Sequence, residues 1–209
     1  MRPHPRIALL ALATVAALAV ALAAILDRSA SRSASPSATS GASANSGFDG
    51  AALPAPTRAR DFTLTDQSGQ AVSLSRYRGR VTVLAFLYST CGPTCVLIAQ
   101  QIRGALDELP HPVPVLFVSV DPSADTPARI SSFLAQVSLT GRVRYLTGSR
   151  ASLQPIWRAY GVVPPTAGRA AFERSAAVLL LDRGGRERVI FQLEQLTPEG
   201  LTHDIGKLQ

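Results

Sequence analysis

The stretch VTVLAFLYSTCGPTCVLIAQQIRGALDEL, residues 81–109, decides the fold. Residues 81–88 form an unbroken run of apolar, β-branched and aromatic side chains, which predicts a strand that is buried on both faces. Residues 96–109 carry apolar side chains at helical spacing. Cys91 and Cys95 lie between these two elements. The stretch therefore predicts a buried strand, a loop that bears both cysteines, and a helix.

Strands and helices alternate through the rest of the chain. Apolar runs predict four further strands, and apolar residues at helical spacing predict three further helices. The strands are expected at 115–120, 143–146, 176–181 and 188–193, and the helices at 127–137, at 152–160 and from residue 197. A hairpin is expected around Gly69, and a mobile loop rich in Pro, Gly and Ala at 162–172. This order predicts an α/β protein with the layout of the thioredoxin-like fold, a mixed central sheet flanked by helices with an N-terminal hairpin.

The N-terminal part of the chain differs in composition from the rest. Residues 7–26 contain no charged side chain, and at about 1.5 Å per residue they can cross the roughly 30 Å hydrocarbon core of a membrane. An uncleaved anchor and a cleaved signal peptide both fit this segment. Residues 27–59 are dominated by Ser, Ala, Gly and Pro, which predicts a flexible tether. We therefore expect a membrane anchor or signal segment at 1–26, the tether, and one folded domain at 60–209.

Charge and composition narrow the classes of function. Arginines precede the apolar N-terminal segment, so the folded domain is expected outside the cytoplasm, on a single-pass protein of the cell membrane. The 21 basic and 14 acidic residues give a net charge of +7, but no basic cluster is interleaved with aromatic residues. No nucleic-acid partner is therefore expected. Two cysteines and one methionine exclude a multi-disulfide scaffold, a cysteine-rich zinc module and a methionine-rich metal site.

The cysteine pair is the candidate site. If Cys95 lies in the first helical turn, its Cα is expected roughly 5–6 Å from that of Cys91, which permits a disulfide. Two thiolates in this arrangement can also bind one Cu(I) ion, and a helix N-terminus favours thiolate over thiol. A purely structural disulfide would close only three intervening residues and stabilise little. The spacing therefore leaves thiol exchange and soft-metal binding open.

The residues around the pair resemble a known family. FLYSTCGPTC (86–95), FTLTDQSGQAVSLSRYRGR (62–80), VSVDPSADTP (118–127) and LTGSRASLQPIWRAYGV (146–162) are together similar to the Sco/SenC family of thioredoxin-like copper proteins. The resemblance implies a role in assembling the dinuclear copper centre of cytochrome c oxidase, with Cys91 and Cys95 as copper ligands. It implies as partner the oxidase subunit that carries this centre, or another exported copper carrier.

One ligand of the family is missing. The resemblance places a histidine where this chain has Arg174, and the two histidines of the expected domain, His111 and His203, are predicted to be ordinary surface residues. Without an imidazole, stable Cu(II) binding is doubtful, whereas Cu(I) can be held by two sulfurs. If Arg174 projects at the site, its charge stabilises the thiolates; otherwise it points to solvent or pairs with a glutamate.

Two functions follow from these residues. The first is Cu(I) handling in oxidase assembly. The second is thiol-disulfide exchange with an exported partner, with Cys91 as the attacking and Cys95 as the resolving thiol, so that the chain is either a metallochaperone or an enzyme-like oxidoreductase. A docking protein without either chemistry is the third and least favoured reading. Asp121 and Asp125, which follow the second buried strand, are expected to serve as a turn residue and a helix cap.

Overall fold

The computed structural model describes residues 46–209. The predicted anchor at 1–26, and the predicted tether up to residue 45, lie outside these residues. Within the described part of the chain, no helix has the length and apolar character needed to cross a membrane.

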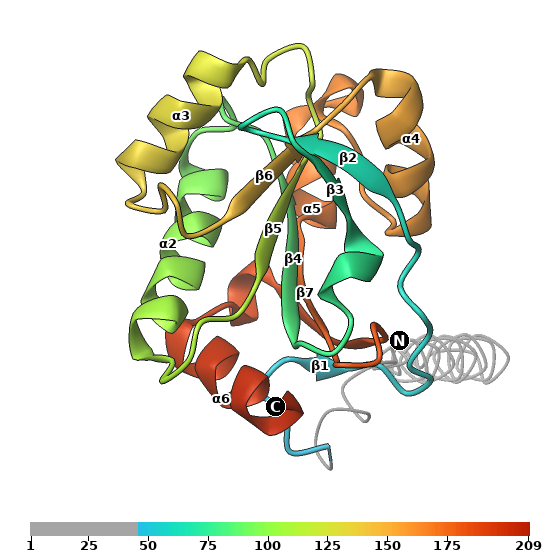
Figure 1. Cartoon of the computed structure of the whole chain (residues 1–209), viewed down its shortest axis with the longest axis vertical. Coiled ribbons are helices and arrows are strands. Elements are labelled where there is room, and N and C mark those ends of the chain that lie inside the picture. Colours follow the sequence, from blue (N-terminus) through green and yellow to red (C-terminus); the bar gives the residue numbers. More distant parts are fainter. Residues whose placement is uncertain (1–45) are drawn as a thin grey trace, which may run out of the picture. The chain divides into compact units, whose positions relative to one another are not determined.

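Eight strands of the described residues form one mixed sheet, in the order β1-β8-β7-β4-β5-β6-β2-β3 (Figure 1). β4, β5 and β6 are parallel, and the other neighbours pair antiparallel. The strands are β1 (Ala51–Ala52), β2 (Thr63–Asp66), β3 (Ala71–Ser73), β4 (Thr82–Leu87), β5 (Val115–Ser119), β6 (Arg144–Thr147), β7 (Ala177–Leu181) and β8 (Glu187–Gln192).

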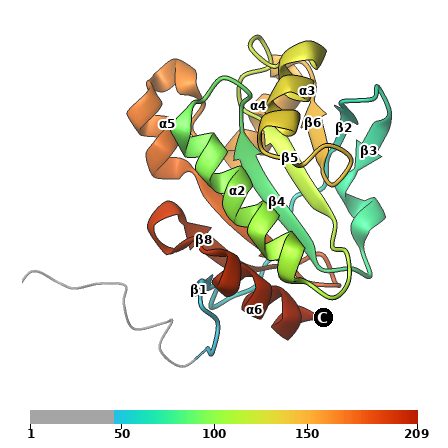
Figure 2. The ribbon, with the colours of Figure 1, turned by 90° about the vertical axis from the view of Figure 1, so that its left-hand side faces the viewer.

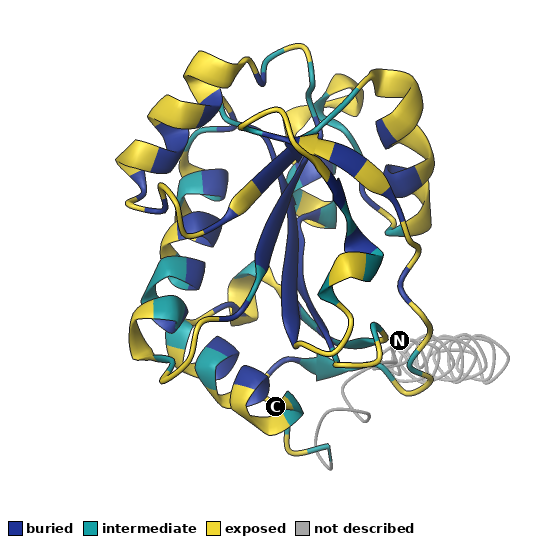
Figure 3. Cartoon of the chain, in the orientation of Figure 1, coloured by how far each residue is buried: buried dark blue, intermediate teal, exposed yellow. Residues whose placement is uncertain are grey.

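The central strands confirm the sequence pattern. All six residues of β4, all five of β5 and all five of β7 are buried, which Figure 3 shows as a dark core through the middle of the sheet. A strand covered on both faces needs apolar side chains at every position rather than at every second one. β2 and β3 form the expected hairpin, with Gly69 in its turn at a positive φ of 85°.

Helices cover both faces of the sheet. α2, α3 and α6 lie on one side and α4 on the other (Figures 1 and 2). Thr126, Ser149 and Thr197 cap α3, α4 and α6 through their side-chain oxygens. The helices are α2 (Pro93–Glu108), α3 (Pro127–Gln136), α4 (Arg150–Ala159), α5 (Arg169–Ser175) and α6 (Pro198–Leu208), with short 3-10 turns η1 (Leu74–Tyr77), η2 (Pro165–Ala167) and η3 (Leu193–Gln195).

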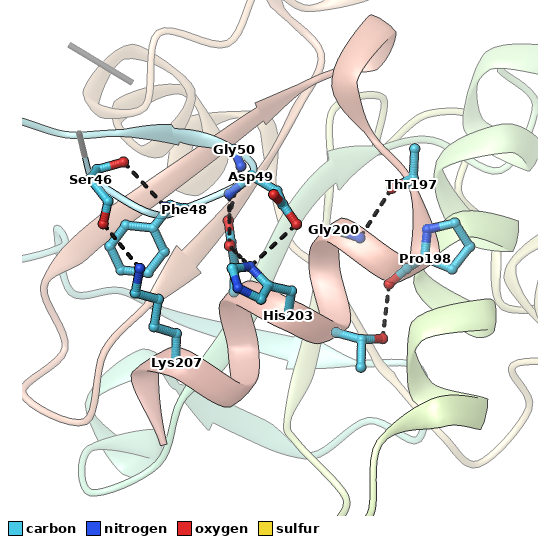
Figure 4. Close-up of polar contacts among 11 residues, drawn as sticks. Ser46, Phe48, Asp49, Gly50, Thr197, Pro198, Gly200, His203 and Lys207 are labelled. Carbon is cyan, nitrogen blue, oxygen red and sulfur yellow. Dashed lines mark hydrogen bonds and ion pairs between the residues drawn. The ribbon is translucent and has the colours of Figure 1, made fainter. Parts of the chain in front are cut away.

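The folded part of the chain begins before residue 60, where the sequence analysis places its boundary. β1 pairs antiparallel with β8 at the edge of the sheet. The buried carboxylate of Asp204 in α6 accepts hydrogen bonds from the backbone N–H groups of Asp49 and Gly50, each at 2.9 Å (Figure 4). Residues 48–59 show no alternation of polar and apolar side chains, so their attachment through backbone groups leaves no signal in the sequence.

The expected mobile loop at 162–172 is also corrected. η2 and α5 occupy most of it, and α5 continues to Ser175, directly before the strand expected at 176–181. Seven residues are too few to show a helical stripe. Packing of Phe172, which is fully buried, holds this helix against the core.

Candidate functional site

The cysteine pair lies at the carboxyl end of β4. Cys91 follows the strand, and Cys95 is in the first turn of α2. The two sulfurs form a disulfide, and the Cα atoms are 5.7 Å apart, inside the range expected from the spacing. Cys91 is 1% exposed and Cys95 is fully buried. In this oxidised form, the pair is therefore covered by its surroundings.

A glycine makes the turn between the two cysteines possible. Gly92 has a φ of 80°, in the left-handed region that other residues adopt only with strain. The turn leads directly into Pro93 at the first position of α2, where a proline costs no hydrogen bond. The backbone N–H groups at the start of α2 are directed toward the cysteine loop, and their partial positive charge favours anionic sulfur there.

The buried carboxylate of Asp125 is hydrogen-bonded to the cysteine loop. Asp125 is 4% exposed and accepts hydrogen bonds from the Ser89 backbone N–H (2.7 Å), the Ser119 hydroxyl (2.6 Å) and the Tyr145 hydroxyl (2.8 Å). It therefore connects the cysteine loop to β5 and β6. This corrects the expectation of a helix cap, because Thr126 is the cap of α3.

Two tyrosines near the site have raised pKa values. Burial raises the pKa of Tyr145 well above its usual value, and the charge and hydrogen bond of Asp125 add to the effect. Burial likewise raises the pKa of Tyr88, the last aromatic residue before Cys91. Both phenols therefore remain neutral over the physiological range and act as hydrogen-bond or packing groups.

Helix α5 lies against the cysteine loop. The rings of Phe172 and Tyr88 meet edge to face, with centroids 5.2 Å apart. The Thr94 hydroxyl donates a 3.0 Å hydrogen bond to the carboxylate of Glu173. The guanidinium of Arg169 lies beside Gly92, with its nitrogens 3.6 and 3.8 Å from the point where a Cβ on that glycine would be. These contacts belong to residues that the sequence analysis does not place at the site.

The structure does not bring Arg174 to the cysteines. Its side chain is exposed at the end of α5, and it forms no hydrogen bond or ion pair with the residues that the structure describes. The structure therefore describes Arg174 as a surface residue of α5.

The histidines also lie away from the pair. His111 precedes β5, at the opposite end of the parallel strands from the cysteine loop, and it is exposed. His203 is in α6, which contacts the far end of α2, where the Thr202 hydroxyl donates to Glu108 at 3.1 Å. Its Nδ1 lies 2.9 Å from a carboxylate oxygen of Asp204 (Figure 4). No imidazole of residues 46–209 is therefore placed to join the two sulfurs.

The donor set fits one oxidation state of copper. Two sulfurs close enough to form a disulfide can bind one Cu(I) ion after reduction, because Cu(I) accepts two thiolate ligands. Cu(II) prefers nitrogen and oxygen donors, and the cysteine loop adds no imidazole. As a donor set, two thiolates without an imidazole therefore suit Cu(I) better than Cu(II).

Comparison with known proteins identifies the family. The SCO1/SenC family model matches residues 51–209. The mitochondrial SCO1 homolog of Homo sapiens is 30% identical over 115 residues, which make up 51% of this chain and 36% of that protein. Alignments with the curated relatives span between 34% and 58% of those proteins' own lengths.

Solved structures agree with this match. The copper-bound structure of ScoI from Bradyrhizobium japonicum is 28% identical, with a TM-score of 0.55, and covers 73% of this chain and 100% of that one. The structure of BsSco, a Sco-family cytochrome c oxidase assembly protein with a disulfide switch, has a TM-score of 0.64 over 75% of this chain and 95% of that one. At 21% identity, the second likeness shows the fold alone. The predicted thioredoxin-like fold is thus confirmed, and the chain belongs to the SCO1/SenC family.

Proposed function

We propose that this chain carries Cu(I) on Cys91 and Cys95 during assembly of the copper centre of cytochrome c oxidase. The observation that carries the proposal is the placement of both sulfurs, in contact, at the carboxyl end of β4 and the N-terminus of α2. Membership of the SCO1/SenC family supports it. The partner is the oxidase subunit that holds this centre, or another exported copper carrier.

The chemistry of loading needs only the reduced pair. Two thiols release two protons and bind one Cu(I), which gives a copper–dithiolate unit with one net negative charge. Transfer proceeds when thiolates of a partner replace Cys91 and Cys95 at the metal, which soft Cu(I)–sulfur bonding permits. No oxidation or reduction of copper is required in these steps.

An anaerobic competition titration tests this proposal. The reduced full-length chain is titrated with Cu(I) against a chromophoric Cu(I) chelator, and one equivalent is expected to bind. Cys91→Ser and the oxidised chain, in which both sulfurs are already bonded, are the controls and are expected to bind none. If the reduced chain does not compete with the chelator for Cu(I), the proposed copper-carrying function is contradicted.

A second function is favoured by the disulfide and by the absence of an imidazole beside it in the described part of the chain. In this reading, the Cys91 thiolate attacks a disulfide of an exported partner and forms a mixed disulfide, while one partner sulfur leaves as a thiolate. Cys95 then attacks Cys91, which releases the second partner thiolate and leaves the Cys91–Cys95 disulfide. Two electrons pass to the partner, and an external dithiol must reduce the pair again.

The product that Cys95→Ser forms with a disulfide tests the thiol-exchange function. With oxidised glutathione as the probe, thiol exchange predicts that the reduced wild-type chain releases glutathione, whereas Cys95→Ser accumulates the mixed disulfide at Cys91. Mass spectrometry distinguishes the two products. If neither forms at a useful rate, thiol exchange is withdrawn and copper carriage remains.

We further propose that residues 7–26 anchor the chain in the cell membrane and that residues 46–209 work outside the cytoplasm. Support comes from the uncharged apolar run and the arginines before it. Fractionation of cells that express the full chain, followed by protease treatment from the outer side, tests both points. Retention of the domain in the soluble cytoplasmic fraction contradicts them.

A further inference from the structure

The charges near the cysteine loop are mostly negative. Two carboxylates are hydrogen-bonded to this loop and the start of α2: Asp125 accepts from the Ser89 backbone N–H, and Glu173 accepts from the Thr94 hydroxyl. The positive charge beside them is the guanidinium of Arg169, next to Gly92. An anionic group formed at the cysteine pair therefore lies among negative neighbours, and one arginine opposes them.

Two contacts hold the helix that carries this arginine. Phe172 is fully buried against Tyr88, and Glu173 is fixed by the Thr94 hydroxyl. With α5 attached in this way, the Arg169 guanidinium comes to rest beside Gly92, the residue that follows Cys91. No side chain separates them at that point, because Gly92 has none. Packing therefore fixes the helix that carries this charge, while the Arg169 side chain itself is exposed beside the cysteine loop.

We propose that Arg169 stabilises the negative charge that the Cys91–Cys95 pair acquires when it binds Cu(I). The protonated dithiol is neutral, whereas Cu(I) with two thiolates carries one negative charge once both protons have left, so a nearby guanidinium favours the loaded form. The inference rests on the proposed copper-carrying function and assigns a new residue to it. Arg169 acts through charge and is a positioning residue, because it does not ligate the metal.

The same helix supplies a matched control. Arg174 lies five residues after Arg169, and at 3.6 residues per turn the two side chains point about 140° apart. Arg174 is exposed and forms no ion pair or hydrogen bond in the described part of the chain. Arg169→Gln and Arg174→Gln therefore remove the same charge from one helix, at different distances from the cysteines.

The experiment is a Cu(I) competition titration of the reduced full-length chain in low salt. Opposite unit charges close together at a partly exposed site interact strongly enough to change an affinity about three- to tenfold. Arg169→Gln is therefore expected to weaken Cu(I) binding about three- to tenfold. Arg169→Lys is expected to restore most of the affinity, and Arg174→Gln to leave it unchanged. In 1 M salt, the deficit of Arg169→Gln shrinks, because counterions screen an exposed charge.

Wild-type affinity in Arg169→Gln overturns the inference, and so does an equal loss of affinity in Arg174→Gln. A deficit that persists unchanged in 1 M salt also contradicts it, because a packing defect is not screened. If the wild-type chain binds no Cu(I), the proposed function fails instead. The ratio of dithiol to disulfide in a glutathione buffer at pH 9 then tests Arg169 on its own. Arg169→Gln is expected to shift that ratio at least about threefold toward the disulfide, and an unchanged ratio overturns the inference.

Discussion

Replacing Tyr145 with phenylalanine tests the polar network beneath the cysteine loop. The Tyr145 hydroxyl is fully buried and donates a 2.8 Å hydrogen bond to the Asp125 carboxylate. A hydrogen bond to a charged group contributes about 1.5–3 kcal/mol to stability. Loss of the donor leaves Asp125 with two partners, Ser89 and Ser119. We therefore expect Tyr145→Phe to lower the free energy of unfolding by about 1.5–3 kcal/mol at pH 7.

Urea unfolding of the oxidised chain, followed by fluorescence, measures this loss. For a domain of this size, the corresponding fall in Tm is about 3–12 °C. Tyr160→Phe is the matched control, since its hydroxyl donates to the backbone carbonyl of Arg60 at 3.0 Å in an exposed position. A neutral hydrogen bond of this kind contributes about 0.5–1.5 kcal/mol.

The pH dependence gives a second test of the same reasoning. Because the pKa of Tyr145 is raised in the folded chain, the stability that its neutral form contributes is complete below the pKa of an unfolded tyrosine, about 10. Above that pH, the unfolded wild-type chain ionises and is favoured by about 1.4 kcal/mol per pH unit, whereas the Tyr145→Phe chain has no such group. The difference between the two proteins therefore shrinks as the pH rises above 10. Two results would falsify the network as described: a loss of unfolding free energy in Tyr145→Phe equal to that in Tyr160→Phe, or a difference in unfolding free energy between wild type and Tyr145→Phe that stays constant up to pH 11.

Three further predictions concern other parts of the fold. Gly92→Ala places a Cβ at a positive φ beside a guanidinium, so it should lower the free energy of unfolding by about 1–2 kcal/mol. Gly206→Ala in α6, where nothing lies within 4 Å of the new Cβ, should raise the free energy of unfolding by about 0.5–1 kcal/mol. Urea unfolding measures both changes. Asp204→Asn leaves one side-chain acceptor for the two backbone N–H groups of Asp49 and Gly50, so it should expose residues 46–50 to limited proteolysis without changing Cu(I) binding. Burial alone would raise the pKa of Asp66, but hydrogen bonds from neighbouring residues outweigh this effect, so the net pKa is lowered. The stability that the ionised Asp66 adds is therefore present above about pH 4 and lost below it. The loss of unfolding free energy in Asp66→Asn, measured by urea unfolding, should disappear in acid, and a loss that stays constant with pH contradicts this assignment.

The sequence predicts those parts of the site that depend on local pattern. The buried strand β4, helix α2 and the 5.7 Å distance between the cysteine Cα atoms follow from one continuous stretch of 29 residues, 81–109. Apolar runs and helical spacing likewise place the other central elements to within a few residues. Local spacing is enough in these cases because neighbouring residues determine the geometry.

What the sequence leaves open depends on contacts between distant residues. Thr94 and Glu173 are 79 positions apart, and no pattern in either segment indicates that they meet. The family resemblance draws attention to Arg174 and leaves open whether it projects at the site. The structure instead places Arg169 beside Gly92, which depends on the phase of a seven-residue helix that the sequence does not reveal. The sequence around Asp125 is typical of a turn or a helix cap. Only the hydrogen bond from Tyr145 shows that Asp125 connects the cysteine loop to the sheet.

The attachment of the N-terminal segment has a mechanical consequence. A force applied to the chain before Ser46 first reaches Phe48, whose ring contacts the ammonium of Lys207, and then the two N–H groups held by Asp204 (Figure 4). These contacts lie on α6, which meets the far end of α2 from Cys95. A pull at residue 46 therefore acts first on contacts at the end of α2 that lies opposite the cysteine loop.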